Sequence, residues 1–425
     1  MFHRRYKREF GPWVIPAMYA AIAFAAALTI PHIEGGIAPG FVSPVSISSA
    51  QAIYSSIASG MMALTGIVFS LMFVMIQFSA TAYSPRLVLL ITRDPVTSHA
   101  LGIFTATFVY AIAALTGVDR SGSGSVPYFS ILLVFALVLA SVGMFIALIN
   151  RIGVLQINRT LIFTGDQGHK VITAMYPALS SVAAAPGLDA VRALPRNQTL
   201  VYQGRPRSIQ AIDVGTLVHL ATLSGGIIEM LAAVGDTVVE LTPLLYVTAT
   251  REPISEEKLM KAIQLGGART FEQDPKYAIR LLVDIAIRAL SPAINDPTTA
   301  VQALDQIEDL LLRLGQRDLD IGTHRDSDGQ LRLVVPCPTW DDLLRLAFDE
   351  ICFCGAASIQ VMRRMNALVA DLTRAVPEEH RAALGYWDAR LKTTIARSFA
   401  DGEERLDASQ EDRQGLGIPR QHSRG

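Results

Sequence analysis

The feature that most constrains this sequence is a run of fifty-one residues, 35–85, that contains no Asp, Glu, Lys, Arg or His. The hydrocarbon core of a bilayer requires about 20 apolar residues in a helix, and residues 52–80 of this run exceed that length. The run therefore predicts one membrane span with a polar but uncharged external loop before it.

Charged residues divide the chain into two parts. Of the 37 basic and 38 acidic residues, only eleven lie in residues 1–150, and the other sixty-four lie in 151–425. The first part is predicted to be a membrane domain and the second a soluble one. Beyond residue 150 the chain has thirty basic and thirty-four acidic residues, so it lacks the basic excess expected of a nucleic-acid-binding domain.

Four apolar segments predict four transmembrane helices, at 13–33, 52–80, 99–118 and 128–150. The first is longer than the apolar core of a signal peptide, so an uncleaved anchor is predicted. Lys and Arg are concentrated before the first span, in the 81–98 loop and after the last span. The positive-inside rule then predicts a multi-pass protein of the bacterial inner membrane, with both termini in the cytoplasm.

Polar and small side chains of the second span project from one side of the predicted helix. At 100° per residue they fall within about 80° of one another. The residues of this stripe are Ser55, Met62, Gly66, Ser70, Phe73 and Gln77. Small residues let membrane helices pack closely, whereas Ser and Gln can line a path that Met62 and Phe73 constrict. Both interpretations stay open, and the second requires a homo-oligomer, because one four-span chain is small for a pore.

Asp, Glu, Lys and Arg are absent from all four predicted spans. Proton relays and ion-coupled transporters use such residues at membrane depth, so this class of protein is disfavoured. Arg86 is the first basic residue after the second span, and it is expected to attract anions at the cytosolic mouth of a permeation path.

The soluble part is predicted to contain three segments. Residues 151–254 form a connector that continues the fourth span as a helix and then carries a small β-rich module. In this module a strand pair turns at Gly204-Arg205-Pro206, and a short helix and two further strands follow. Residues 255–400 are predicted to be helical, and the polar tail, 401–425, is predicted to be disordered. The fold class is therefore an α-helical integral membrane domain of four transmembrane helices plus a cytosolic α+β domain that is mostly helical.

A helix pair within 255–400 carries the candidate contact residues of the soluble part. These residues are Arg269, Asp274, Arg288, Asn295 and Asp296. Asp and Pro are frequent at helix starts, so an ion-paired, capped helix hairpin explains them structurally. The alternative is a contact for a ligand or a second subunit at the Ser-Pro-Ala-Ile-Asn-Asp turn.

Catalytic and cofactor motifs are absent from the sequence. There is no H-E-x-x-H pair, no phosphate-binding G-x-x-x-x-G-K-[ST] loop and no G-x-S-x-G elbow. The three cysteines, Cys337, Cys352 and Cys354, suggest neither a disulfide framework nor a four-ligand metal site. No enzyme activity, cofactor or metal is therefore predicted.

The chain resembles the predicted bacterial membrane proteins that carry domain of unknown function 2254, over nearly its whole length. The resemblance rests on Ser84-Pro85-Arg86, on Gly235-Asp236 with Pro243-Leu244, and most specifically on residues 284–300, DIAIRALSPAINDPTTA. At residues 207–213 the chain departs from the more usual turn of the family. The resemblance implies the four-span layout with a soluble region and implies no activity.

Two functions are compatible with these observations. The leading hypothesis is a homo-oligomeric channel or passive permeation protein in the lipid bilayer, with the second span at its axis and the cytosolic helices holding and gating it. The alternative is a membrane-anchored sensor or scaffold that binds a ligand or partner through the helix pair from Arg269 to Asp296. An enzyme acting at the membrane face is a third and weaker possibility.

Overall fold

The computed structural model describes residues 13–37, 45–82, 95–118, 127–152, 157–179, 195–250 and 252–417 of the 425-residue chain. The chain forms two compact units that divide between Gln156 and Ile157. The first is called the membrane unit and the second the C-terminal unit, and each is described by itself.

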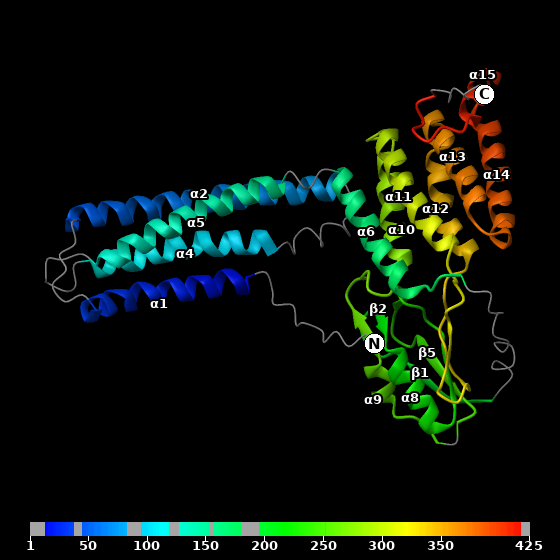
Figure 1. The fold of residues 1–425 in the computed structure, drawn as a ribbon, viewed down its shortest axis with the longest axis horizontal. Helices are drawn as coiled ribbons and strands as arrows, with labels where there is room; N and C mark the ends of the chain where they lie inside the picture. Colours follow the sequence, from blue (N-terminus) through cyan, green and yellow to red (C-terminus); the bar gives the residue numbers. More distant parts are fainter. Residues whose placement is uncertain are drawn as a thin grey trace. The chain divides into compact units, whose positions relative to one another are not determined.

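Four helices make up the described part of the membrane unit (Figure 1). Their bounds are α1 Val14–Ile37, α2 Ile47–Ala82, α4 Pro95–Gly117 and α5 Tyr128–Ile152. All four are long and apolar enough to cross a membrane, which confirms the predicted four-span fold class. Half of the α4 span is buried, against 17–22% of each other span, because α4 packs against all three other helices.

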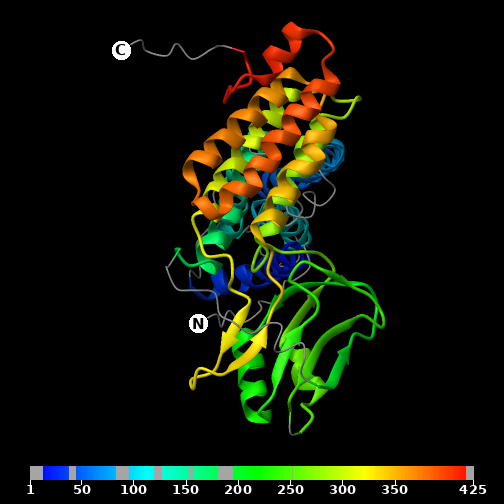
Figure 2. The ribbon, with the colours of Figure 1, turned by 90° about the vertical axis from the view of Figure 1, so that its right-hand side faces the viewer.

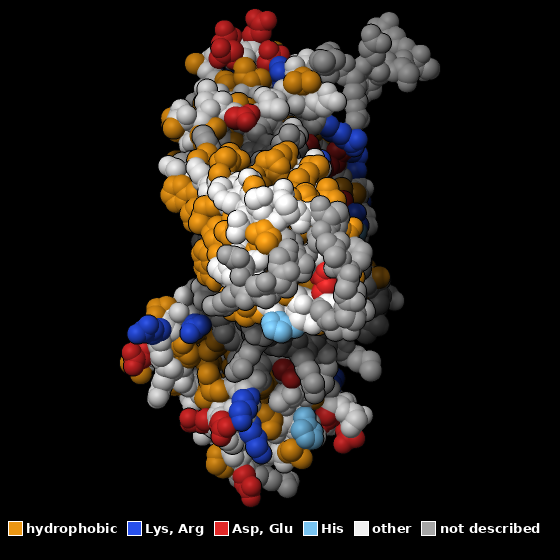
Figure 3. Space-filling view, turned by 90° about the vertical axis from the view of Figure 1, so that its left-hand side faces the viewer, with side chains coloured by type: hydrophobic (Ala, Val, Ile, Leu, Met, Phe, Trp, Pro, Cys, Tyr) orange, Lys and Arg blue, Asp and Glu red, His pale blue; other side chains and the backbone are white. Residues whose placement is uncertain are grey.

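Hydroxyl groups join the helices inside the membrane unit. The hydroxyls of Tyr54 and Tyr110 both hydrogen-bond the Ser130 hydroxyl, each at 2.9 Å, and Thr107 and Ser141 pair at 2.9 Å. These contacts link α2, α4 and α5 through hydroxyl groups, for which lipid tails offer no hydrogen-bond partner. Outside, hydrophobic side chains gather along the flank of the unit in Figure 3, as expected of a surface in contact with lipid.

Glu34 is the one acidic residue that the described part of a span contains. The sequence predicts that the first span ends at residue 33, but α1 continues to Ile37, and Glu34 is only 9% exposed. Its two carboxylate oxygens accept the backbone N–H groups of Tyr128 and Phe129, at 2.6 and 3.0 Å. A carboxylate is favourable there because the first N–H groups of a helix have no partner within it. Glu34 thus lies at the end of its span and not in the middle of it.

Replacing Glu34 with alanine is expected to loosen the junction between α1 and α5. Two N–H groups in an apolar setting lose their acceptor, which costs about 2–3 kcal/mol. Hydrogen exchange of the full chain in detergent should then accelerate at the first turn of α5. Glu34→Gln keeps one acceptor oxygen and should lie between alanine and wild type, whereas unchanged exchange in Glu34→Ala would contradict this role.

Two small sheets form one part of the C-terminal unit (Figure 2). The five-stranded sheet has the order β1-β5-β3-β8-β7, in which β3 and β8 are parallel and the other pairs antiparallel. The three-stranded sheet is antiparallel, in the order β4-β2-β6. The strands are β1 Arg196–Val201, β2 Arg207–Ile212, β3 Ile227–Met230, β4 Thr237–Val238, β5 Pro243–Thr248, β6 Ile263–Gly266, β7 Thr323–Arg325 and β8 Leu331–Val334. One buried aliphatic cluster joins both sheets with α8, Val214–Ser224, and α9, Glu256–Lys261.

A helical bundle forms the other part of the C-terminal unit (Figures 1 and 2). Its helices are α6 Ile157–Met175, α10 Pro275–Ala289, α11 Pro297–Gly315, α12 Trp340–Cys354, α13 Ile359–Ala375, α14 Glu378–Ser398 and α15 Gly402–Ser409. Helices α10 and α11 are central, since α10 packs against α6 and α12, and α11 packs against α6 and α13. The predicted N-caps are confirmed, because Asp274 and Asp296 accept the backbone N–H groups of Tyr277 and Thr299.

The predicted hairpin of two strands around Gly204 is wrong. The chain does turn there, with Gly204 at a φ of +144°. However, β1 pairs with β5 in one sheet, and β2 pairs with β4 and β6 in the other. A turn signal locates a reversal of the chain, whereas pairing is decided by which face each strand buries.

Strands from both predicted segments of this unit share its sheets. Hairpin β7–β8, from 255–400, joins the five-stranded sheet through β3, and β6 joins β2 of 151–254. The strands of 151–254 alone would leave these edges unpaired, and such edges need a partner or a cover. The fourth span is predicted to continue as a helix beyond residue 150. Residues 153–156 of this continuation lie outside the described residues.

Helix α15 lies in the tail, 401–425, for which disorder is predicted. Asp401 caps the helix, and Arg413 pairs with the buried Asp371 of α13 at 2.5 and 2.8 Å. Polar composition predicts disorder when a segment has nothing to bind, and here the partner lies 42 residues earlier in the chain. The expectation of disorder is therefore corrected for residues 401–417.

Candidate functional site

The stripe predicted on the second span lies on the exposed side of α2. The exposed residues include Ser55, Met62, Gly66, Ser70, Phe73 and Gln77. The buried side, which includes Tyr54 and Val68, packs within the unit, where Val68 clusters with Phe104 of α4. At 100° per residue, the centre of the stripe lies about 140° around α2 from the centre of that buried side. Ser55, Gly66 and Ser70 of the stripe are thus not buried against the described part of the chain.

Glycines show where small residues serve packing in the membrane unit. A Cβ on Gly102 of α4 would lie 3.1 Å from the Tyr19 ring, so the absence of a side chain permits close approach of α1. A Cβ on Gly66 would meet no atom within 4 Å. Close packing at Gly66 therefore needs a partner outside the described part of this chain. Arg86, the predicted cytosolic mouth, lies outside the described residues.

Arg269 and Asp274 form a buried ion pair at the start of α10. The Asp274 side chain is 1% exposed, and its Oδ2 accepts Nε and Nη2 of Arg269 at 2.8 and 2.7 Å. Burial raises the pKa of Asp274, and the Arg269 guanidinium opposes this rise. Gly235, at a φ of +92°, lies against the pair, and a Cβ there would overlap Asp274 Oδ2. The structure thus brings the Gly235-Asp236 turn to the base of the helix pair.

The other three candidate residues of the helix pair lie at the far end of α10. Arg288 is in its last turn, Asn295 is exposed with a φ of +49°, and Asp296 caps α11. Helix α10 has fifteen residues, so about 22 Å separates the two groups. The five candidates therefore form a buried ion pair at one end and an exposed turn at the other.

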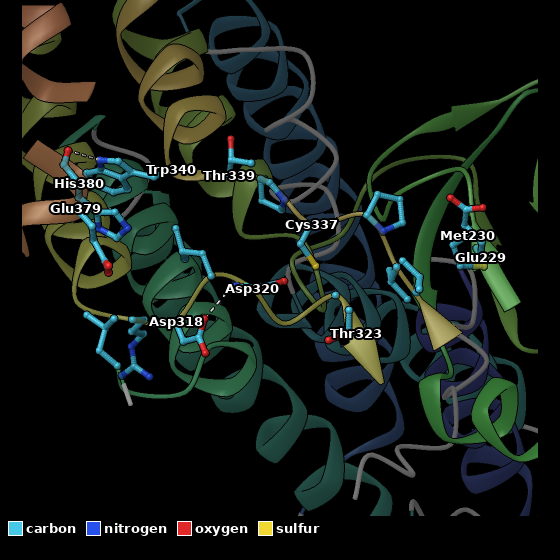
Figure 4. Close-up of a pocket in the computed structure, with 18 residues that line it drawn as sticks. Glu229, Met230, Asp318, Asp320, Thr323, Cys337, Thr339, Trp340, Glu379 and His380 are labelled. Atoms are coloured by element: carbon cyan, nitrogen blue, oxygen red, sulfur yellow. Dashed lines mark hydrogen bonds between the residues drawn. The ribbon is translucent and has the colours of Figure 1, made fainter. Parts of the chain in front are cut away.

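A cavity of about 500 Å³ lies between the five-stranded sheet and the helical bundle of the C-terminal unit (Figure 4). Strands β3, β7 and β8 line one side, and the starts of α12 and α14 line the other. The loop before β7 contributes Arg317, Asp318 and Asp320, and the loop after β8 contributes Cys337. Figure 4 shows Trp340, His380 and Glu379 together at one end of the group, with Glu229 at the other.

Local contacts position the side chains at the bundle end of this cavity. The Trp340 indole Nε1 donates to the His380 carbonyl at 3.1 Å, and the two rings stack with centroids 4.9 Å apart. His380 Nδ1 lies 3.1 Å from the Gly315 carbonyl, which can only accept, so this nitrogen carries the proton. In the neutral ring, His380 Nε2 is then an acceptor.

The sequence does not single out the cavity as a site. Asp318, Asp320, Trp340 and His380 come from three separate segments, and each sits in an ordinary local pattern. The spacing of Cys337 from the other two cysteines indicates neither a disulfide nor a metal site. A Pro on each side of Cys337 is the one local signal of a fixed, non-helical segment there.

The model of the family of predicted membrane proteins termed DUF2254 matches residues 11–371. The chain belongs to this family. Uncharacterized proteins of Mycobacterium tuberculosis and Mycobacterium bovis are similar to it, each 26% identical over 406 residues, which cover 92% of this chain and 78% of the relative. No solved structure matches the chain.

The most specific DUF2254-like stretch has a structural explanation. Residues 284–300 comprise the second half of α10, the exposed turn and the first turn of α11. Asn295 adopts the left-handed conformation that Asn tolerates, and Asp296 with Pro297 starts the next helix. These residues define the turn geometry of this DUF2254 protein, and the exposed tip leaves a surface for contacts.

Proposed function

We propose that the protein self-associates in the membrane through the stripe of α2 and that the associated copies surround a passive permeation path. The observation that carries this proposal is the position of Ser55, Gly66 and Ser70 on the exposed side of α2, away from α4. Polar side chains gain nothing from lipid, whereas a second copy offers hydrogen-bond partners and close backbone approach.

The side chains of the stripe favour a passive path rather than a coupled transporter. Met62 and Phe73 are 57% and 63% exposed, so copies that meet at the stripe would place these apolar groups near a common axis. Apolar constrictions can gate by dewetting. Apart from Glu34 at the end of the first span, the described parts of the spans contain no Asp, Glu or Lys for coupling to protons or ions. In this proposal the positive-inside rule places both termini in the cytoplasm and the protein in the bacterial inner membrane.

Gly66→Leu is expected to abolish association and leave the fold of each copy intact. The added side chain meets open space within the chain and removes an unfavourable glycine from a helix. Gly60→Leu is the matched control, because Gly60 is equally open but lies about 120° around α2 from Gly66. Oligomer mass in mild detergent and in nanodiscs measures the effect. A monomeric wild type, or equal loss in both variants, would end the proposal.

Permeation is tested separately by flux through proteoliposomes. A charge at the proposed constriction, in Phe73→Glu, should change ion flux severalfold. Leu139→Glu on α5, which is 73% exposed, is the control for a charge elsewhere on the outside of the unit. If the oligomers stay ion-tight under voltage and tension, the proposed permeation path is wrong, whereas the proposed association through α2 is unaffected.

A membrane-anchored ligand-binding protein is the second candidate function. The observation that favours it is the cavity of the C-terminal unit, which mixes carboxylates with apolar walls. Ligand sites have this composition, in which a few polar groups orient a ligand held mainly by apolar contact. In this second proposal the membrane unit anchors a sensor or scaffold, and the exposed turn at Asn295 is the surface for a partner.

A further inference from the structure

The cavity of the C-terminal unit permits an inference about the class of its ligand, which rests on the second candidate function. Its volume of about 500 Å³ lies within the range of about 300–1,000 Å³ for small-molecule sites. Its wall belongs entirely to the C-terminal unit. The apolar lining includes Leu179, Val334, Pro336 and Pro338, which can cover the carbon body of a ligand.

Carboxylates dominate the charged groups of the cavity. Glu229, Asp318, Asp320 and Glu379 line it, and Arg317 is the one Lys or Arg among its described lining residues. The Arg317 guanidinium donates to the Tyr176 carbonyl, and its single positive charge is outnumbered by the four carboxylates. In the neutral tautomer that the Gly315 carbonyl selects, His380 Nε2 adds an acceptor. The cavity thus presents acceptors and negative charge.

The carboxylates are too dispersed to hold a metal ion. Among the described residues, no three His, Cys, Asp or Glu side chains come together in a metal-binding group. Figure 4 places Asp318 and Asp320 in the middle of the group, with Glu379 and Glu229 towards opposite ends. Charge spread along an apolar wall suits a ligand that carries its positive charge at more than one point.

The pKa values of two buried groups, Cys337 and Tyr176, are also shifted in this region. Burial and then the Asp320 carboxylate raise the pKa of the Cys337 thiol to about 11. The Tyr176 side chain is 1% exposed, and its hydroxyl has no hydrogen-bond partner among the described residues. Burial and then the Cys337 thiol raise the pKa of Tyr176. A protonated phenol can both donate and accept a hydrogen bond.

We infer that the cavity binds a small organic amine cation, with ammonium groups at the carboxylates and an aliphatic body against the Val334 and Pro336 side. Ammonium groups donate to carboxylates without requiring the tight convergence that a metal ion demands. The aliphatic stem of such a cation contributes apolar contact of the kind that this wall provides.

The three cysteines provide the test in the full chain in detergent. Cys337 lines the cavity, Cys354 is exposed and Cys352 is buried. Alkylation by N-ethylmaleimide is followed at each cysteine by mass spectrometry, with spermidine or 1,4-diaminobutane added at constant ionic strength. At ten times its Kd, an amine should slow Cys337 alkylation about tenfold. Cys354 should react at an unchanged rate, and Cys352 should stay unmodified as a check of the fold.

Variants connect this protection to the carboxylates. In Asp318→Asn/Asp320→Asn, the amines should lose their protection of Cys337, while the rate without ligand should rise as the nearby negative charge is removed. Asp309→Asn, at an exposed ion pair on α11, is the control and should retain full protection. Protection by succinate and not by amines would overturn the amine class and leave a ligand-binding function standing. No protection by any probe would overturn the inference, and neither result bears on association through α2.

Discussion

Replacing Arg364 with alanine is expected to destabilise the C-terminal unit by about 3–5 kcal/mol, because the change leaves a buried charge without its partner. The Arg364 side chain is 3% exposed in α13, and it pairs with Glu308, which is 13% exposed in α11. It also pairs with Asp305 at 2.8 Å, but that carboxylate is 49% exposed and contributes little. The fluorescence of Trp340 and Trp387 during urea unfolding of the full chain in detergent measures the change.

The effect of Arg364→Ala should depend on pH. Burial raises the pKa of Glu308, and Arg364 opposes that rise, so the pKa of Glu308 rises further in the variant. A carboxyl group with a raised pKa in the folded protein favours the fold while it is protonated, and this contribution is lost as the pH increases through the folded pKa. The loss of stability should therefore be greater at pH 8 than at pH 5.

Two further variants separate charge from packing. Arg313→Ala removes a partly exposed ion pair with Asp309 on the same helix as Glu308, and it should change stability by less than about 1 kcal/mol. Arg364→Met/Glu308→Leu replaces the charges by apolar groups and should recover much of the loss. If Arg364→Ala alone is as mild as Arg313→Ala, the pair does not stabilise the unit.

Membrane helices and helix caps could be predicted because their signals are local. A bilayer imposes a minimum apolar length, so the four spans are visible as runs, and Asp274 and Asp296 stand where a cap is needed. The ends of the spans could be predicted less accurately than their existence. Glu34 was assigned to a loop because charge normally ends a span, whereas burial against the first turn of α5 keeps it inside the unit.

Contacts distant in the sequence account for most of what could not be predicted. β1 and β2 flank a turn signal yet join different sheets, since their partners β5 and β6 lie further along the chain. Arg413 binds Asp371 from a segment whose composition alone suggests disorder. The cavity residues Asp320 and His380 are 60 positions apart, so no spacing rule relates them. The stripe of α2 could be found from periodicity, but only the structure shows that it faces away from α4.

Replacing Asp274 with alanine is expected to cost about 3–5 kcal/mol, since it removes a helix cap and leaves the Arg269 guanidinium without its carboxylate. The side chain is 1% exposed and caps α10 through the Tyr277 N–H at 3.2 Å. Asp274→Asn keeps an acceptor for the cap and should lie between alanine and wild type. Urea unfolding of the full chain measures both, and an Asp274→Asn variant as stable as the wild type would show that the ion pair adds nothing to the cap.

The neighbouring glycine provides a sharper version of this test. Gly235→Ala strains a φ of +92° and also drives a Cβ into Asp274 Oδ2, with Arg269 Nη2 only 3.0 Å away. Backbone strain alone costs about 1–2 kcal/mol, and the clash adds to it. In an Asp274→Ala background the clash with the carboxylate disappears, so Gly235→Ala should cost less there than in wild type. Additive effects of the two changes would mean that Gly235 is required only for the turn, and not for the approach of the sheet to α10.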